Sequence, residues 1–276
     1  MQSGKSFHSH FGVVDHDTMI GREEGSELEA RQRDGTVTGS GRYLVFRPTL
    51  ADVVIGMPRG AQVIYPKDLG AILVAADVFP GARILEAGVG SGALSMTLLR
   101  AGARVIGYEI REEFARRAVA NVGLVAGSDA SYEVHDRDVY EEIAEPDLDR
   151  VVLDVPEPWR VAGHAAAALR PGGILVAYLP TINQTAELRD ELRSSGFVLA
   201  ETFEILRRTW HIEGRSVRPD HRMVAHTGFL TSARLASAPM ARRPRRKEQA
   251  GAEDPRDLAP APDQKTKSPT ATAEGD

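Results

Sequence analysis

Hydrophobic positions follow two different periods along this chain, and the change between them divides it. Up to about residue 55, short β-like runs such as YLVF (43–46) stand among Gly, Ser, Asp and Thr, which is typical of a β-rich segment. KDLGAILVAADV (67–78) instead spaces its apolar residues as one face of a helix does. We therefore predict a small N-terminal β domain over residues 1–55 and a larger domain over residues 56–236.

Strands and helices alternate through most of the larger domain. The predicted strands are 82–87, 103–109, 131–136, 149–155 and 172–179, and the predicted helices are 92–101, 112–122, 160–169 and 183–195. Strands that recur with helices between them form βαβ units and a parallel sheet. Two further strand-like stretches, 196–206 and 222–235, have no long helix between them, so we expect an antiparallel pair at the sheet edge. The predicted fold is α/β, Rossmann-like, with a mostly parallel, seven-stranded sheet.

Composition limits what the chain can be. From Ser237 onward it carries Pro, Ala and charge with almost nothing apolar, so we predict that residues 237–276 are disordered. No stretch approaches the roughly 20 apolar residues of a membrane span, and the start has no signal-peptide core. The absence of cysteine excludes disulfides and thiolate metal sites. We expect a cytoplasmic protein without membrane contact or metal.

The most informative short segment is EAGVGSG (86–92), a bare loop between a predicted strand and a predicted helix. Such a loop is where α/β sheets hold ligands, because glycines admit a ligand to the backbone and helix N–H groups point at it. Its G-x-G-x-G spacing differs from the G-x-G-x-x-G of dinucleotide sites and favours S-adenosylmethionine, whose methionine end carries no phosphate. The predicted cofactor contacts here are Glu86, Gly88, Gly90, Ser91, Gly92 and Leu94.

Acidic residues follow the next two predicted strands. Glu109 ends the second strand, where a carboxylate can accept hydrogen bonds from both ribose hydroxyls of an adenosine. NAD would use the same acid, so Glu109 alone does not discriminate between the two cofactors. Asp138 follows the third strand and is placed to meet an adenine amino group, with Asp136 as a competing candidate.

The fourth predicted strand ends in Asp154 within DRVVLDVPEPW (149–159), at the edge that faces the cofactor's reactive group. An ionised carboxylate only accepts hydrogen bonds, so it suits a substrate that donates one and gains positive charge. Adenine attacked at N1 does both, because its 6-amino group donates and the product is a cation. The alternative is that Asp154 caps the helix after the strand.

These segments resemble a known family, the tRNA (adenine-N1) methyltransferases that modify adenosine 58 in the T-loop, in their bacterial and archaeal homotetrameric form. The similar segments, in family order, are FRPTLADVVIGMPRGAQVIYPKD, ILEAGVGSGALSMTLLR, GYEIREEFARRAVANV, VVLDVPEPW, VAYLPTINQ and HTGFLTSAR. The resemblance implies a class I S-adenosylmethionine-dependent methyltransferase fold, tRNA as partner and a homotetramer. It also implies that Asp154 holds the target amino group, that Tyr65 lies in the base pocket, and that Gln62 and Glu109 contact the cofactor.

Some features depart from the family or leave its function open. The chain begins within the family's N-terminal β domain, at FHSHFG, and its LLRAGARVIGYE loop is shorter. The family histidine matched by His226 has no assigned role. One alternative is a class I methyltransferase acting on a protein or a small molecule, although Asp154 would repel a carboxyl substrate. The other is a catalytically silent RNA-binding partner, which the intact glycine loop disfavours.

Charge bears on how tRNA would be held. The net charge of −5 is unusual for a tRNA enzyme, so binding would depend on local groups such as Arg42, Arg47 and Arg59. For the basic run ARRPRRK (241–247) we favour a solvated tail over a docking site. In the pocket we expect the Tyr65 ring to stack on the extruded base, and we expect Pro66 and Lys67 to fix the loop and offer a phosphate contact.

Overall fold

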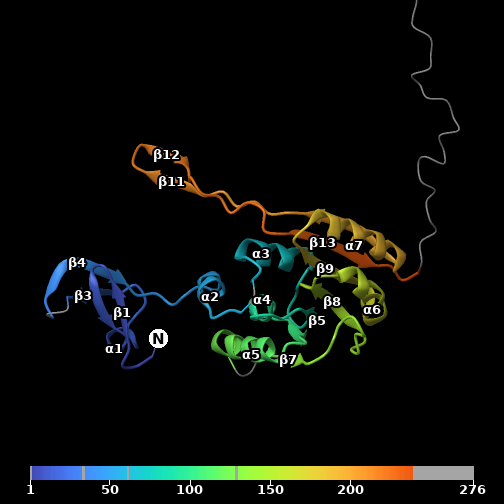
Figure 1. Cartoon of the computed structure of the whole chain (residues 1–276), viewed down its shortest axis with the longest axis horizontal. Coiled ribbons are helices and arrows are strands. Elements are labelled where there is room, and N and C mark those ends of the chain that lie inside the picture. Colours follow the sequence, from blue (N-terminus) through green and yellow to red (C-terminus); the bar gives the residue numbers. More distant parts are fainter. Residues whose placement is uncertain (1, 33–34, 61, 128–129, 239–276) are drawn as a thin grey trace, which may run out of the picture. The chain divides into compact units, whose positions relative to one another are not determined.

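The computed structural model describes residues 2–32, 35–60, 62–127 and 130–238. Its N-terminal part is an antiparallel four-stranded sheet of order β1-β2-β3-β4 (Figure 1). The elements are β1 (Ser6–Ser9), β2 (Gly12–Asp15), α1 (His16–Met19), β3 (Glu27–Arg31) and β4 (Val37–Leu44). Val14, Leu28 and Ala30 form its small core. The predicted β-rich N-terminal segment is confirmed.

The larger part is built on a seven-stranded sheet of order β10-β13-β9-β8-β5-β6-β7. Its strands are β5 (Arg83–Ala87), β6 (Arg104–Tyr108), β7 (Tyr132–His135), β8 (Leu148–Leu153), β9 (Leu169–Leu179), β10 (Phe197–Phe203) and β13 (Phe229–Leu235). Neighbouring strands in the series β9-β8-β5-β6-β7 pair in parallel, whereas β13 is antiparallel to both β9 and β10. The predicted mostly parallel sheet with an antiparallel edge is confirmed.

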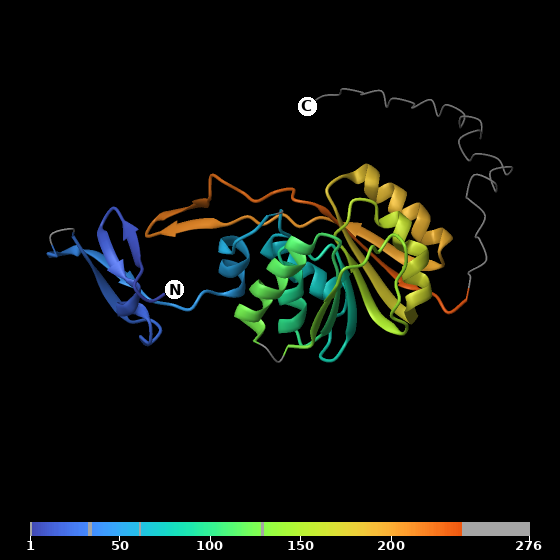
Figure 2. The same ribbon diagram turned by 60° about the horizontal axis from the view of Figure 1, so that its bottom comes forward.

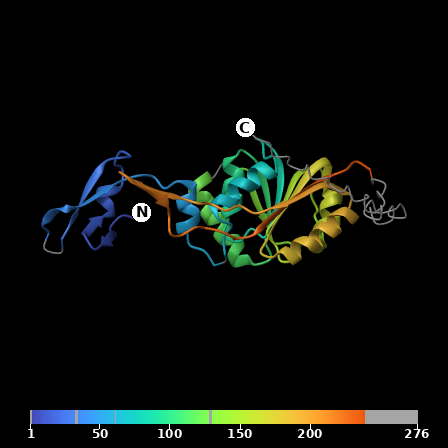
Figure 3. The same cartoon turned by 90° about the horizontal axis from the view of Figure 1, so that it is seen from above.

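Helices cover both faces of this sheet (Figures 2 and 3). On one face lie α2 (Leu50–Gly56), α3 (Pro66–Ala75), α4 (Ala93–Arg100) and α5 (Glu112–Ala126), and on the other lie η1 (Pro158–Val161), α6 (Ala162–Ala168) and α7 (Ile182–Ser194). Successive strand residues enter opposite cores: Ile84 packs with the first group and Leu85 with the second, both fully buried. Each such side chain contributes about 1.5–3 kcal/mol through burial. Through Val54, α2 packs into the first core.

The structure differs from the sequence prediction most clearly around α6 and between β10 and β13. The helix expected over 160–169 is a 3₁₀ turn followed by the seven-residue α6, and β9 begins at Leu169. A hairpin of β11 (Trp210–Glu213) and β12 (Ser216–Pro219), absent from the prediction, lies between β10 and β13. The predicted disordered segment lies almost wholly outside the described residues. No helix of the described part is long and apolar enough to cross a membrane.

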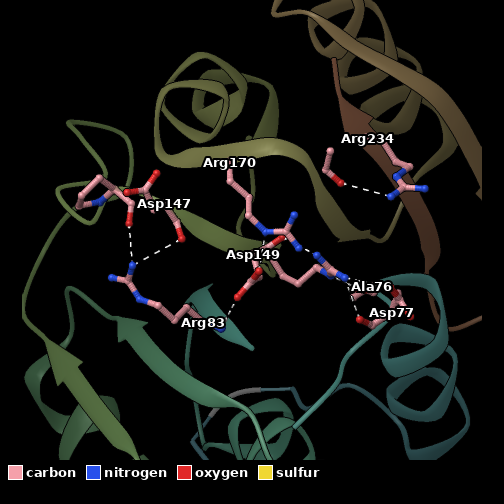
Figure 4. A network of polar contacts seen from close by, with 10 residues as sticks. Ala76, Asp77, Arg83, Asp147, Asp149, Arg170 and Arg234 are labelled. Carbon is pink, nitrogen blue, oxygen red and sulfur yellow. Dashed lines mark hydrogen bonds and ion pairs between the residues drawn. The ribbon is translucent and has the colours of Figure 1, made fainter. Parts of the chain in front are cut away.

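A polar network fixes the sheet at the amino-terminal ends of β5 and β8, opposite the glycine loop (Figure 4). Arg150 is buried and donates to the Ala76 carbonyl, the Asp77 carbonyl at 2.9 Å and the Asp77 carboxylate at 3.0 Å. Asp149 accepts from the backbone N–H of Arg83 at 2.8 Å and from Arg170 at 2.6 Å. These bonds satisfy charges that burial would otherwise make costly.

Candidate active site

The glycine loop joins β5 to α4 at the carboxyl edge of the sheet. Gly88, Gly90 and Gly92 have φ values of 82°, 57° and 83°, in the left-handed region that favours glycine. A Cβ atom on Gly88 would lie 2.1 Å from the Asp154 carbonyl oxygen. Only glycine therefore permits the loop to pass against the end of β8, which brings the predicted cofactor loop and the predicted catalytic residue together.

Glu109 lies against this loop, as expected from its place after β6. Its carboxylate is buried, accepts the Gly90 N–H at 3.0 Å and accepts both the backbone N–H and Nε of Arg111 at 3.1 and 3.2 Å. These bonds orient an anionic acceptor beside the glycine loop, where an adenosine ribose would meet it.

Glu86 and Ser91 are buried without hydrogen-bond partners among the residues that the structure describes. Burial raises the pKa of Glu86 to about 8; Ser95 acts against this shift, and the charges of Asp154 and Glu109 add to it. Buried polar groups are normally satisfied, so unpartnered ones at a loop of this kind indicate a ligand. A cationic ligand would satisfy the Glu86 carboxylate best.

Asp154 directly follows β8, and its N–H donates to the Ala87 carbonyl at 2.9 Å. Burial raises the pKa of Asp154 to about 7, and the charge of Glu109 contributes to the shift. Perturbed carboxyl groups gathered at one sheet edge are typical of a functional site. Burial thus favours the protonated form of Asp154 in the free protein, whereas the role predicted for it needs the ionised form.

Tyr65 precedes α3, and Pro66 occupies the first turn of that helix. Tyr178 in β9 is a further aromatic of this edge that the sequence analysis did not single out. Burial raises the pKa of Tyr178 to about 12, and the nearby charges of Asp68 and Asp154 and the Tyr65 side chain add to the shift. Its ring packs so closely on Gly228 that a Cβ there would lie 2.4 Å from it.

Lys67 fixes its loop, as predicted, but its ammonium group is enclosed. Its side chain is 5% exposed and its Nζ atom donates to Asp68 at 2.7 Å and to Thr227 at 2.6 Å. Thr227 donates in turn to the second oxygen of Asp68 at 2.6 Å. A lysine enclosed and neutralised in this way does not contact a phosphate. We call this group the buried lock, because it ties the first turn of α3 to the segment before β13.

The remaining predicted site residues are placed less centrally. Asp138 is half-buried and accepts the N–H of Tyr140 at 2.8 Å, while Asp136 is exposed. Gln62 is exposed, and Leu94 is buried in the first hydrophobic core.

His226 has two hydrogen-bond partners, and the N-terminal histidines form no metal site within the described residues. His226 lies between the Glu204 carboxylate at 2.9 Å and the Pro180 carbonyl at 3.2 Å. The hydrogen bond to Glu204 raises the pKa of His226. Through these two bonds, His226 links the residue after β10 to the residue after β9. His8, His10 and His16 belong to no cluster of three metal-ligating side chains within the described ranges.

The sheet order, the glycine loop and the acids at the carboxyl ends of β5, β6 and β8 define a class I S-adenosylmethionine-dependent methyltransferase fold. The family model described as tRNA methyltransferase complex GCD14 subunit matches residues 43–227, and a TrmI-like N-terminal model matches residues 1–27. The chain belongs to this tRNA methyltransferase family.

Individual relatives agree. A protein of Methanocaldococcus jannaschii described as tRNA (adenine(57)-N(1)/adenine(58)-N(1))-methyltransferase TrmI is 36% identical, over 86% of this chain and 91% of its own length. The solved structure of tRNA (m1A58) methyltransferase TrmI from Aquifex aeolicus matches with a TM-score of 0.75 and 29% identity, covering 86% of this chain and 91% of that one. A Thermotoga maritima structure described as an S-adenosylmethionine-dependent O-methyltransferase has a TM-score of 0.77 and 33% identity, covering 87% and 88%.

Proposed function

We propose that the protein methylates N1 of adenosine 58 in the T-loop of tRNA, with S-adenosylmethionine as methyl donor. The observation that carries the proposal is the placement of Asp154 against the glycine loop, beside Glu86 and Glu109. Family membership supplies the substrate class, and the names of the Methanocaldococcus and Aquifex relatives supply the position on tRNA.

The residues present fit this cofactor. Gly88 and Gly90 open the backbone at the loop, and Glu109 is an oriented acceptor for the ribose. Glu86 is a buried carboxyl group without a partner in the described structure, and the positive charge of the methionine end would favour its ionised form. We assign the adenine contact to Asp138 and a further contact to Gln62. When bound, S-adenosylmethionine supplies an electrophilic methyl group on its sulfonium.

Asp154 would act on the target base. Its carboxylate would accept a hydrogen bond from the 6-amino group of adenine, which orients N1 for attack. Methylated adenine carries a positive charge, and the ionised carboxylate stabilises this charge as it develops. No proton has to leave N1 first, so the site needs no strong base. Tyr65, near Tyr178, would offer a ring face to the extruded base.

The experiment is methylation of an unmodified tRNA transcript followed by mass spectrometry of its nucleosides and of the digested tRNA. We expect 1-methyladenosine at position 58, and loss of the product when adenosine 58 is replaced by another nucleoside. The same measurement shows whether position 57 is modified and separates base methylation from ribose O-methylation. Methyl transfer to a protein or a small molecule, with none to tRNA, would contradict the proposal.

We further propose that the protein acts as a homotetramer in the cytoplasm. The β11–β12 hairpin supports the assembly, because Trp210, Ile212 and Val217 are 57%, 73% and 60% exposed. A two-stranded hairpin is marginally stable alone in water, and apolar side chains of this size favour a protein contact. A second copy of the chain is the occupant we propose for this surface.

A further inference from the structure

The Pro156–Glu157 peptide group, two residues beyond Asp154, is held at both of its polar atoms. Its carbonyl oxygen accepts a hydrogen bond from Gln184 Nε2 at 3.1 Å, and its N–H donates to the Tyr140 hydroxyl at 3.0 Å. Tyr140 lies in the connection after β7, and Gln184 lies in the first turn of α7. Two elements far apart in the chain therefore hold one peptide plane, an arrangement that we call the peptide clamp.

The Gln184 half of the clamp has a defined orientation. Thr181 precedes α7 as its N-cap, and its hydroxyl donates to Gln184 Oε1 at 2.6 Å. The amide oxygen is thereby engaged, which leaves the amide N–H₂ group to donate to the Pro156 carbonyl. The start of α7 thus fixes both the position and the rotation of the Gln184 side chain.

The Tyr140 half is fixed as well. The Tyr140 N–H donates to Asp138 at 2.8 Å, so its backbone is tied to the acid proposed to meet the cofactor's adenine. The guanidinium of Arg160 lies 4.4 Å from the centre of the Tyr140 ring and pairs with the Glu157 carboxylate at 2.8 Å. The segment that contains Glu157 and Arg160 therefore contacts Tyr140 twice: its guanidinium group lies over the ring, and its peptide N–H donates to the hydroxyl.

The clamped peptide group lies between two fixed points. Asp154 is bound to β5 through the Ala87 carbonyl, and η1 begins at Pro158. The bond to Ala87 holds the backbone N–H of Asp154, so a rotation of the Pro156–Glu157 plane would be passed through Val155 to the carbonyl and side chain of Asp154. Displacements of about 1 Å at a reacting group reduce rates strongly, so the orientation of this plane matters for catalysis.

We propose that Tyr140 and Gln184 are positioning residues, which set the rate of methyl transfer by holding the Pro156–Glu157 peptide group and thereby Asp154, without touching cofactor or tRNA. This inference rests on the proposed function, because the rate to be measured is that of tRNA methylation. It assigns no chemical step to either side chain.

The first test is hydrogen exchange followed by mass spectrometry on the full chain. Pro156 and Pro158 have no N–H, so residues 155–158 contain only the exchangeable amides of Val155 and Glu157. In Tyr140→Phe the Glu157 amide loses its acceptor, and we expect its exchange to accelerate at least about tenfold. The ring and its packing are retained in this variant, so the melting temperature should stay close to that of the wild type.

The second test is the single-turnover rate at saturating tRNA and S-adenosylmethionine. Tyr140→Phe and Gln184→Met should each slow methylation roughly three- to tenfold, the loss expected for one hydrogen bond, with cofactor affinity within about twofold. Because both side chains hold the same peptide group, the double variant should be slower than either single one by much less than the product of their effects. Arg193→Ala, an exposed change elsewhere on α7, is the matched control and should leave the rate unchanged.

The proposal is overturned by unchanged exchange at Glu157 in Tyr140→Phe, whatever the substrate proves to be. Single-turnover rates equal to the wild type in both single variants would overturn it too, as would effects that multiply fully in the double variant. Failure of the proposed function is a separate result, since there the wild type itself would not methylate tRNA at adenosine 58.

Discussion

At the scale of the residue, the burial of Glu86 at the glycine loop lowers the stability of the folded protein at neutral and higher pH. Its carboxyl group has a pKa near 8 in the folded protein against an ordinary value of 4.5. The unfolded chain therefore releases this proton at lower pH than the folded one. The contribution of Glu86 to the free energy of unfolding is therefore most favourable below about pH 4.5, and it is lost as the pH rises to about 8.

Glu86→Gln removes this titration while keeping the shape of the side chain. We expect the free energy of unfolding of the ligand-free variant to exceed that of the wild type at pH 8 by about 1–3 kcal/mol, and the difference to shrink toward pH 5. Affinity for S-adenosylmethionine should fall, because the variant has no carboxyl group that can ionise against the positive charge of the cofactor. Urea denaturation at both pH values and calorimetry measure these effects. Glu112→Gln, an exposed change on α5, is the control. An identical pH dependence of the unfolding free energy in Glu86→Gln and wild type would contradict the raised pKa of Glu86.

Asp154 gives a second prediction at this scale. Asp154→Ala should reduce the single-turnover rate on the order of 100–1000-fold, because one transition-state electrostatic contact is lost, while cofactor affinity stays near that of the wild type. In the wild type, the rate should rise with pH around the Asp154 pKa of about 7, because ionisation creates the acceptor. Rapid-quench assays between pH 6 and 8 measure both effects. A variant rate within threefold of the wild type would disprove the role.

At the scale of the element, the buried lock joins α3 to the segment before β13. Lys67→Met leaves the Asp68 carboxylate, which is 0% exposed, without its cation. Breaking a buried ion pair in this way costs about 3–5 kcal/mol. We expect Lys67→Met to lower the melting temperature strongly and Lys67→Met/Asp68→Leu to recover part of the loss. Thermal denaturation of both variants measures this, and a double variant less stable than the single one would show that the pair is not the main interaction.

At the scale of the whole molecule, the exposed β11–β12 hairpin is the surface that we propose for assembly. Ile212→Glu places a charge on the apolar surface of β11, which should dissociate the proposed homotetramer without unfolding the sheet core. Light scattering after size-exclusion chromatography measures the mass. Arg215→Glu in the hairpin turn is the control for charge alone, and an unchanged mass of the Ile212→Glu variant would place the interface elsewhere.

How much of this was visible in the sequence depends on how far apart the interacting residues lie. The βαβ order and the glycine loop could be predicted, because periodicity and loop spacing are local signals. Lys67 was assigned to a phosphate because its burial depends on the segment of Thr227, which lies 160 residues away. The roles of Tyr140 and Gln184 were missed for the same reason. The hairpin was missed because its strands have only four residues each, which is too short for an alternating pattern to be recognised.

The position of β13 has a consequence for how the protein is made. This strand is the last of the sheet in the chain, yet it lies between β9 and β10. Until Phe229–Leu235 has been synthesised, β9 presents an unpaired edge and the first core lacks Leu230. Unpaired edges of this kind promote aggregation. A ribosome that stops before this strand therefore releases a chain with every predicted cofactor residue but an incomplete sheet, so the sheet cannot be completed until Phe229–Leu235 has been translated.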